Sequence, residues 1–510
     1  MRTIITKLSA ILLMALVAAL VGMSQVSVTH AQSAKNASWA VSVTYQNVGN
    51  APAAVGMNFY PELNGTPISF NPLGDGATLA AGAGESFFIG RVSGINAGFR
   101  GSAVMSADQP MVATVVQFSQ DSGMKMRLLS NGFQASDGSE QYLIATTLLD
   151  TFGRTTVFSV QNTESVAIDA TIKFIDASNG SQAASVTHTI PAQSSKYIDL
   201  SNPADTGLPA STTSFNGSAV ISAVQQGTTN AAKVVAAASE YYLNRPLASN
   251  FEGVPLSQAS NTIYMGSAVC ERFGIDTFYA VQNASLTDSA SITVEYRETN
   301  GTVKTSDGPY DIGPGQKKSI RTCNPSSGVS MNNFTGSATI TSTGGAIVAI
   351  GKAQSSLNAP SGSVGPDVVT AFLGQPSGAS KLALPFVRWA PDNEYNGASN
   401  VGGRQRSFIA VQNLEATEIK VNVTYSDKDG VTQGSETLTI PAFAKQNSHA
   451  SRANALGSDG QFGYYGTPIN AFGGGATVEA HTDNPTAKFL AVVRVQHPGA
   501  GEDYNGMPID

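Results

Sequence analysis

A hydrolase of the serine–histidine type would have to be built from the serines and histidines of this chain. Such chemistry needs a nucleophile, a base and a group that orients the base. Beyond the first 31 residues the histidines are His188, His449, His481 and His497, and no HExxH or GxSxG pattern accompanies them. Ser122-Gly123-Met124-Lys125 fits the short S-x-x-K pattern without its usual companion motifs, so we interpret it as a loop between strands. The sequence therefore predicts no catalytic residue.

Metal ligands are also sparse. The two cysteines, Cys270 and Cys323, are expected to form a disulfide, because exported proteins keep such bonds. A metal-binding pair is the alternative, but two thiols without a nearby histidine make a poor zinc site. His481 and His497 are interpreted as exposed or core residues rather than ligands. The sequence predicts no metal and no cofactor.

A short acidic segment, Asp427-Lys428-Asp429-Gly430, resembles a fragment of a calcium loop. It lacks the glycine and the late glutamate that an EF-hand loop needs at fixed positions. We favour a hairpin turn and keep a calcium site at a repeat junction as the alternative.

Adjacent tyrosines are the best candidates for a ligand-facing aromatic patch. One ring of Tyr241-Tyr242 and one of Tyr464-Tyr465 would face outward if these segments are extended. Trp39 and Trp389 lie near strand starts, where we expect them to be buried. Eight N-x-S/T sequons, several of them at predicted turns, are candidate glycosylation positions: Asn36, Asn64, Asn179, Asn216, Asn283, Asn300, Asn333 and Asn422.

A strand that ends in Gln-Asn recurs four times and organises the rest of the chain. Its asparagines are Asn47, Asn162, Asn283 and Asn413, which are 115, 121 and 130 residues apart. In each copy bulky apolar residues stand four and two places before the asparagine, which is the alternation of a strand buried on one face. The Gln-Asn pair could bind a ligand, but we favour an asparagine that caps the strand end by bonding local backbone.

Other signals recur at matching distances from this strand. A hairpin dipeptide (Asn64-Gly65, Asn179-Gly180, Asn300-Gly301, Asp429-Gly430) precedes a Phe-x-Gly-Ser-Ala segment in the first three copies and Phe472-Gly473-Gly474-Gly475-Ala476 in the fourth. In this segment we assign the glycine to a turn and the phenylalanine to the core. Many short strands without helical periodicity predict an all-β fold of four tandem immunoglobulin-like β-sandwich repeats. The expected repeats span residues 32–136, 137–250, 262–373 and 382–510, joined by polar links that space them like beads on a semi-flexible string.

The last three repeats open with an additional strand, which we term the leading strand. The leading strands are predicted at Tyr142–Leu149, Ile263–Cys270 and Leu382–Trp389. The first repeat lacks one, since only seven residues separate position 31 from Trp39. Its sheet should have an unpaired edge, and we hypothesise that a neighbouring molecule fills it; a covering loop or a proline is the alternative.

Residues 1–31 have the features of an export signal. Arg2 and Lys7 precede the apolar run Leu8–Val21, and Thr29-His30-Ala31 resembles a cleavage site. We expect a mature chain without a transmembrane segment, secreted or at the cell surface. The formal net charge is −7 with only 13% charged residues, which gives no electrostatic basis for binding nucleic acid.

The strand-VQN, Ile-Pro-Ala (190–192, 440–442) and Phe-x-Gly-Ser-Ala signals resemble those of tandem-repeat, exported β-sandwich proteins of bacterial cell envelopes. The resemblance implies a surface, matrix or filament component without catalysis. We therefore predict a structural or interaction protein whose partners are itself or other envelope proteins. The alternative is an adhesin that binds glycans or another cell surface.

Overall fold

The structure, a computed structural model, describes residues 33–121, 126–272, 274–355, 368–390, 405–456, 471–497 and 500–509. The predicted export signal, the loop at 122–125 and the pair Tyr464-Tyr465 lie outside these residues. The regular secondary structure of the described part is nearly all β-strand, with one short α-helix and four 3-10 turns. Every strand pair is antiparallel, which confirms the predicted all-β class. No helix among the residues described is long and apolar enough to cross a membrane.

We group the strands into four units, each containing one Gln-Asn strand. Unit 1 contains β1 (Trp39–Asn47), β2 (Val55–Pro61), β3 (Ile68–Phe70), β4 (Gly84–Phe88), β5 (Gly101–Ala107), β6 (Met111–Ser119) and β7 (Arg127–Asn131). Unit 2 contains β8 (Gln141–Leu149), β9 (Arg154–Asn162), β10 (Ile168–Asp176), β11 (Gln182–Ile190), β12 (Ser195–Asp199), β13 (Phe215–Gln225), β14 (Val234–Tyr242), β15 (Ala248–Glu252) and β16 (Val254–Pro255).

The other two units follow the same order. Unit 3 contains β17 (Thr262–Cys270), β18 (Ile275–Asn283), β19 (Ala290–Glu298), β20 (Val303–Ile312), β21 (Lys317–Arg321), β22 (Phe334–Gly344), β23 (Ile347–Ser355) and β24 (Val369–Leu373). Unit 4 contains β25 (Lys381–Ala390), β26 (Gln405–Asn413), β27 (Ile419–Ser426), β28 (Thr432–Ile440), β29 (Lys445–Ser448), β30 (Phe472–Ala480), β31 (Phe489–His497), β32 (Ala500–Asn505) and β33 (Met507–Pro508). The helical turns are η1 (Ala34–Asn36), η2 (Ile89–Arg91), η3 (Ala135–Asp137), α2 (Pro203–Thr206) and η4 (Leu256–Gln258).

Each unit pairs two layers of strands. The Gln-Asn sheet of unit 2 has the order β12-β9-β14-β15, and its outer sheet has the order β11-β10-β13-β8-β16. Unit 3 repeats this pattern, and in unit 4 both layers join into one nine-stranded sheet. Strand β10 buries Ile168, Ala170, Ile172 and Phe174 between the layers, because alternate residues of a strand point to the same face.

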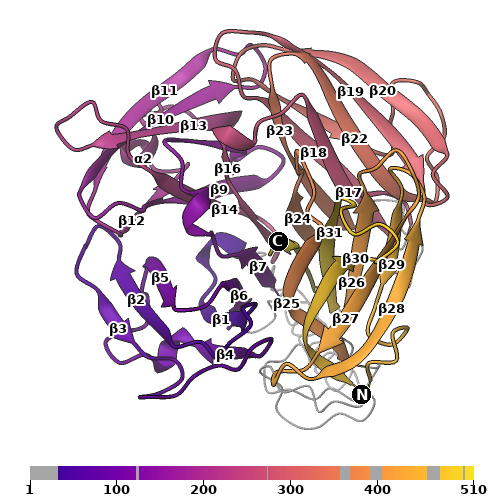
Figure 1. The fold of residues 1–510 in the computed structure, drawn as a ribbon. Coiled ribbons are helices and arrows are strands. Elements are labelled where there is room, and N and C mark those ends of the chain that lie inside the picture. The colour runs from indigo at the N-terminus through magenta and orange to yellow at the C-terminus, as the bar shows by residue number, and fades with distance from the viewer. Residues whose placement is uncertain are drawn as a thin grey trace, which may run out of the picture.

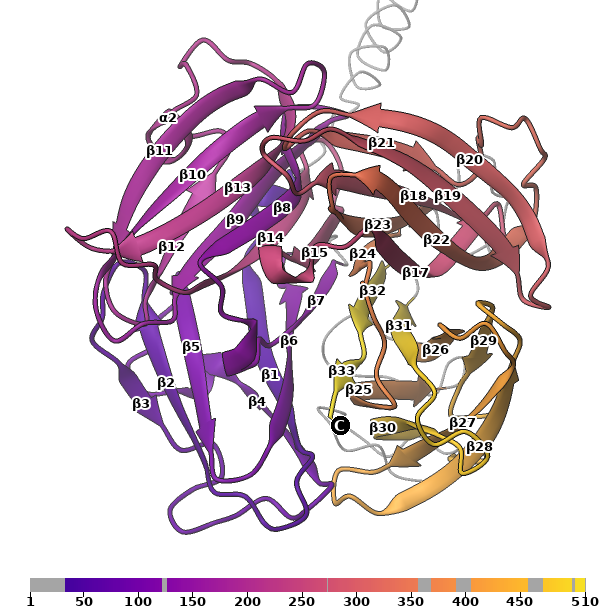
Figure 2. The ribbon, with the colours of Figure 1, turned by 45° about the horizontal axis from the view of Figure 1, so that its top comes forward.

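The four units close into a ring (Figures 1 and 2). Strands β7, β15, β24 and β32 contact one another around the middle, and β25 of unit 4 packs against β1 and β6 of unit 1. Hydrophobic clusters cross the junctions: Val348 and Ile350 of unit 3 join the core of unit 2, and Leu490 of unit 4 joins that of unit 3. The expected string of separate beads is therefore wrong.

The structure confirms the predicted leading strands and hairpins but not the predicted links. The three leading strands are present as β8, β17 and β25, and all four hairpin dipeptides lie between paired strands. The link expected at 250–261 is in part strand, because β15 and β16 continue into it. Strand β15 extends the Gln-Asn sheet of unit 2 and contacts its neighbours at the ring centre, so this segment joins units instead of separating them.

The Gln-Asn asparagine makes the same four hydrogen bonds in every unit. The Asn162 Nδ2 donates to the carbonyls of Val166, Ile190 and Pro191 at 2.8–3.1 Å, and its Oδ1 accepts from the Glu164 N–H. The bonds recur at Asn47, Asn283 and Asn413, all fully buried. The predicted capping role is confirmed, and the side chain also holds a loop about 30 residues away in sequence.

Replacing this asparagine should destabilise its unit strongly. Asn283→Ala leaves three carbonyls and one N–H without their buried partner, so we expect the free energy of unfolding to fall by at least about 3 kcal/mol. Urea denaturation measures this, with Asn332→Ala, an exposed asparagine of the same unit, as the matched control. Equal midpoints for the two variants would contradict the role assigned to the motif.

Candidate functional site

Several polar side chains of the recurring segments lie at the junctions between units. The serine of Phe-x-Gly-Ser-Ala crosses each of three junctions: the Ser102 Oγ donates to the Gln193 carbonyl, Ser218 to that of Gly315, and Ser337 to that of Phe443, at 2.7–3.0 Å. The three acceptors occupy equivalent turns with positive φ. The serine is thus a contact between units, which its position in the sequence did not reveal.

The glutamine of the Gln-Asn pair reaches the same acceptors from within the unit. The Gln282 Nε2 donates to the Gly315 carbonyl at 3.4 Å, and Gln161 bonds the Gln193 carbonyl in the same way. One carbonyl thereby accepts from its own unit and from the preceding unit. In units 2 and 3 the pair therefore joins strands and supports the junction, whereas the fully buried Gln412 of unit 4 makes no such bond to the described residues.

The glycine of Phe-x-Gly-Ser-Ala does not form the turn we expected. Gly217 lies inside β13 at a shift in strand register, and a Cβ there would collide with the Ile175 carbonyl. Gly101 and Gly336 are crowded in the same way by the carbonyls of Tyr60 and Arg297. In unit 4 the equivalent glycine is Gly474, two residues after Phe472, and glycine replaces serine at the next position. The junction between units 4 and 1 therefore lacks the serine bond.

Charged side chains are buried where units 2 and 3 meet. Glu240 lies between Arg154 of its own unit and Lys352 of unit 3. Burial raises the pKa of Glu240, but the two cations outweigh it and bring the pKa to about 2. The Lys317 Nζ donates to the Thr146 Oγ1 of unit 2 at 2.9 Å, and desolvation lowers the Lys317 pKa to about 7.

A second polar cluster surrounds the middle of the ring. The Arg127 side chain of β7 pairs with Glu502 of β32 at 3.2 Å, and Glu502 also bonds His497 at 3.0 Å. Burial lowers the pKa of His497 to about 4, so this imidazole is neutral at pH 7. Asn505 bonds the Leu373 backbone in both directions, which links β32 to β24. The Arg127–Glu502 pair thus connects the first and last units, and the Asn505 bonds connect the third and fourth.

A cavity among the described residues lies at the junction of units 1 and 2. Its volume is about 660 Å³, and its lining includes Glu62, Arg100, Lys196, Asp199 and Asp205. Glu62 pairs with Arg100 at 2.7 Å, and Lys196 pairs with Asp205 at 2.7 Å.

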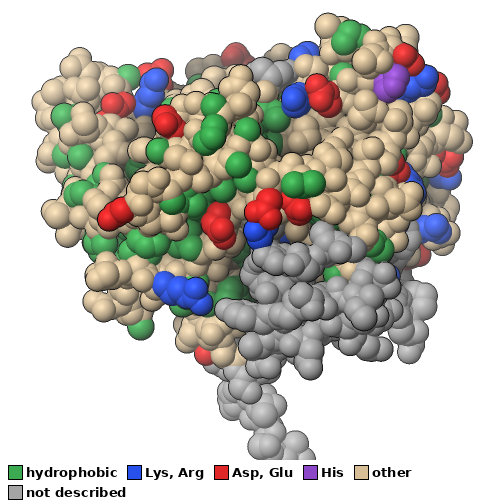
Figure 3. Space-filling view, turned by 60° about the horizontal axis from the view of Figure 1, so that its bottom comes forward, with side chains coloured by type: hydrophobic (Ala, Val, Ile, Leu, Met, Phe, Trp, Pro, Cys, Tyr) green, Lys and Arg blue, Asp and Glu red, His purple; other side chains and the backbone are tan. Residues whose placement is uncertain are grey.

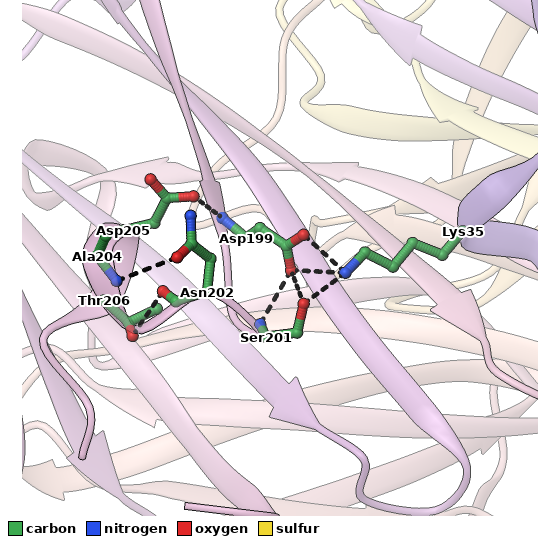
Figure 4. Close-up of polar contacts among 7 residues, drawn as sticks. All are labelled: Lys35, Asp199, Ser201, Asn202, Ala204, Asp205 and Thr206. Carbon is green, nitrogen blue, oxygen red and sulfur yellow. Dashed lines mark hydrogen bonds and ion pairs between the residues drawn. The ribbon is translucent and has the colours of Figure 1, made fainter. Parts of the chain in front are cut away.

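Lys35, which precedes β1, forms an ion pair with Asp199 across this junction (Figure 4). Its Nζ contacts both oxygens of Asp199, at 2.6 and 2.9 Å, and the Ser201 Oγ at 2.6 Å. Partial burial raises the pKa of Asp199, but the bonds from Lys35 and Ser201 hold it below its usual value. The Asn202 Oδ1 accepts from the Ala204 N–H and caps α2, which carries Asp205 into the cluster. The carboxylates bordering the cavity are therefore paired with cations of units 1 and 2.

The structure confirms the disulfide between Cys270 and Cys323. It joins the end of the leading strand β17 to the segment after β21, within unit 3. Asp276 lies beside the two sulfurs, but disulfide-bonded sulfurs are not thiolate ligands, and Asp276 pairs with Arg321 at 2.8 Å. The segment at 427–430 is a hairpin turn, as favoured, and its Asp427 carboxylate accepts from the backbone of Asp429 and Val431.

The candidate ligand-facing tyrosines of unit 2 belong to junctions instead. Tyr241 packs 6.4 Å from Trp39 of unit 1, and Tyr242 lies under the Arg154 guanidinium at 4.4 Å. Both rings are half-buried, so neither offers an open platform for a sugar. Trp389 is buried as expected and stacks on His449, whereas Trp39 is half-buried.

The remaining histidines are spread over separate places. The His188 Nε2 bonds the Asp205 carbonyl, and His481 contacts Asp483 on the surface of unit 4. His497 is buried, as the interpretation of a core residue requires.

The candidate glycosylation positions differ in exposure. Five are exposed, at Asn36, Asn64, Asn179, Asn300 and Asn333, whereas Asn216 and Asn422 are half-buried. Asn283 is fully buried and its amide already donates three bonds, so the folded chain has no room for a glycan there.

Comparison with known proteins gives no relative for this chain: no family model matches it, and no curated protein is significantly similar to it. The function has to be argued from the ring and its junctions.

The serine bond across a junction can be tested alone. Ser218→Ala removes the bond to Gly315 at a fully buried position, so we expect the free energy of unfolding to fall by about 1–2 kcal/mol. Ser185→Ala, an exposed serine in β11, is the matched control and should change it by less than about 0.5 kcal/mol. Equal stability of both variants, measured by urea denaturation, would show that the bond does not hold the units together.

Lys317 gives a test with a defined pH dependence. Its folded pKa of about 7 lies below the unfolded value of 10.5, so the unfolded chain binds more protons between these values and stability rises with pH across this window. Lys317→Met should stabilise the protein at pH 7 and lower the slope of unfolding free energy against pH by up to about 1.4 kcal/mol per pH unit.

The matched control for this test is Lys318→Met, which removes the exposed lysine next along β21. It should keep the slope of the unmodified protein. An unchanged slope in Lys317→Met, from denaturation curves between pH 7 and pH 10, would show that Lys317 is charged in the folded state throughout this window.

Proposed function

We propose that this chain is an exported structural or interaction protein of the cell surface or extracellular matrix, built from four immunoglobulin-like units, that acts by contact. The observation that carries the proposal is how the motif side chains are used. The four repeated asparagines, three serines and the buried ion pairs join strands or units to one another. Because the repeated residues hold the frame of the protein together, they favour a structural role over catalysis.

The surface supports the same proposal. Charged side chains are thinly spread over the face shown in Figure 3, where backbone and uncharged side chains dominate. The sequence as a whole has only 13% charged residues. Such a surface does not steer polyanions, and it suits close packing against another neutral protein surface. The cavity between units 1 and 2 has paired charges, so it offers neither a free nucleophile nor a free base to a substrate.

Direct observation of assembly tests the proposal. The chain from Gln32 onward, purified after export, should form particles larger than the monomer as its concentration rises. Negative-stain electron microscopy and sedimentation velocity measure this. The paired control is the same protein with Asn283→Ala, which should lose the ring and its ordered assemblies together.

Two results would contradict the proposal. Monomers at every concentration combined with saturable binding on a glycan array would support the adhesin alternative. Turnover of any substrate in a hydrolase panel would show that the protein is an enzyme.

A further inference from the structure

Unit 1 has an incomplete outer sheet. In the other units the strand equivalent to β5 has a neighbour on each side: β13 lies between β10 and β8, β22 between β19 and β17, and β30 between β27 and β25. Strand β5 pairs with β2 and ends its sheet among the described residues. The equivalence is residue by residue, because Ala103 opposes Phe59 as Ala219 opposes Phe174 and Ala338 opposes Tyr296.

The missing neighbour leaves core positions of unit 1 open. Ala219, Ala338 and Ala476 are at most 1% exposed, but the equivalent Ala103 is exposed. Ile221, Ile340 and Val478 are fully buried, but the equivalent Met105 is only half-buried. Hydrophobic side chains also lie open on the left side of Figure 3, where unit 1 is placed in Figure 1. The edge therefore exposes apolar surface that the other units cover.

The three leading strands show what covers such an edge. Each places two large apolar residues, two positions apart, opposite the pair that is open in unit 1. These residues are Tyr142 and Ile144, Ile263 and Met265, and Leu382 and Leu384, all at most 1% exposed. Residues Gly101–Ala107 carry no charge and include no proline, so β5 lacks the features that usually block pairing at an edge.

Among the described residues, the junction of units 1 and 2, next to the free edge of β5, also lacks the strand that packs at the other junctions. A leading strand packs on the Gln-Asn sheet of the next unit: β8 on β18 and β23, β17 on β26 and β31, and β25 on β1 and β6. At the junction of units 1 and 2 the short turn η1 contacts β14 instead. The apolar cluster there has only four buried residues, among them Ala34 and Ala248. The 660 Å³ cavity adjoins this junction, beside Phe99 and Arg100 at the start of β5.

We propose that the free edge of β5 binds an extended strand of another polypeptide chain. This inference rests on the proposed function and names the site through which the chain would assemble. The occupant is a segment of about nine residues, uncharged, with two large apolar side chains two positions apart that pack on Ala103 and Met105. Backbone hydrogen bonds to β5 supply part of the affinity, and burial of the two apolar side chains supplies the selectivity.

The test uses a peptide with the sequence of residues 141–149, the leading strand of unit 2, carrying a fluorophore. Fluorescence anisotropy should show saturable binding to the chain that starts at Gln32, and hydrogen exchange should slow at amides of residues 101–107. The same peptide with N-methyl groups at alternate residues cannot form its backbone bonds, so its affinity should fall by at least about tenfold. This control leaves the protein unchanged.

A protein variant locates the site. Ala103→Asp places a charge at an exposed position of β5 where the peptide would pack, and should weaken binding by at least about tenfold. Ser69→Asp, at an exposed position of β3 on the opposite edge of the same sheet, is the matched control and should bind normally.

Three results would overturn the proposal. One is no saturable binding of the peptide, and another is equal binding of the N-methylated peptide. The third is binding to the chain from Gln32 but not to the chain that keeps residues 1–31, because the edge would then be filled by the chain's own N-terminal segment. A protein that binds the peptide yet forms no assemblies would keep the site and contradict the proposed function.

Discussion

The buried asparagine at the end of the Gln-Asn strand is the constraint on which the rest of the ring depends. Its fully buried side chain bonds three carbonyls and one N–H of the surrounding backbone. Because two of these carbonyls belong to the turn before the next strand of the same sheet, the asparagine also fixes that turn. This turn also carries the carbonyl that accepts a hydrogen bond from the serine of the preceding unit. One side chain therefore sets both the interior of a unit and its contact with a neighbour.

The features that could be predicted from the sequence are those that depend on near neighbours in the chain. Alternation revealed the Gln-Asn strands and the leading strands, and glycine-containing dipeptides located the hairpins. The disulfide followed from there being only two cysteines in a chain that was predicted to be exported. These signals are local, so packing between units did not change them.

The ring could not be predicted, because the recurring signals do not show which unit a side chain contacts. Ser218 belongs to a recurring segment, but nothing in that segment shows that its hydroxyl bonds the next unit. Val348 and Ile350 look like core residues of their own unit although they join the core of another. Adjacent tyrosines in a strand point to opposite faces, so one of Tyr241 and Tyr242 was expected to be exposed. In the structure Tyr241 packs against Trp39 of unit 1, and Tyr242 bonds Gln354 of unit 3. The glycine of the recurring segment was assigned to a turn, since only the partner carbonyl shows why a side chain is impossible there.

Cores that are shared between neighbours have a mechanical consequence. Independent sandwiches in a row yield one after another under tension, and each lengthens the chain by its own contour. Here Leu490 of unit 4 packs in unit 3, and Val116 and Leu129 of unit 1 pack in unit 4, so the loss of one unit removes part of the interior of the next. We therefore expect the units of this chain to unfold together under tension, in one step instead of four.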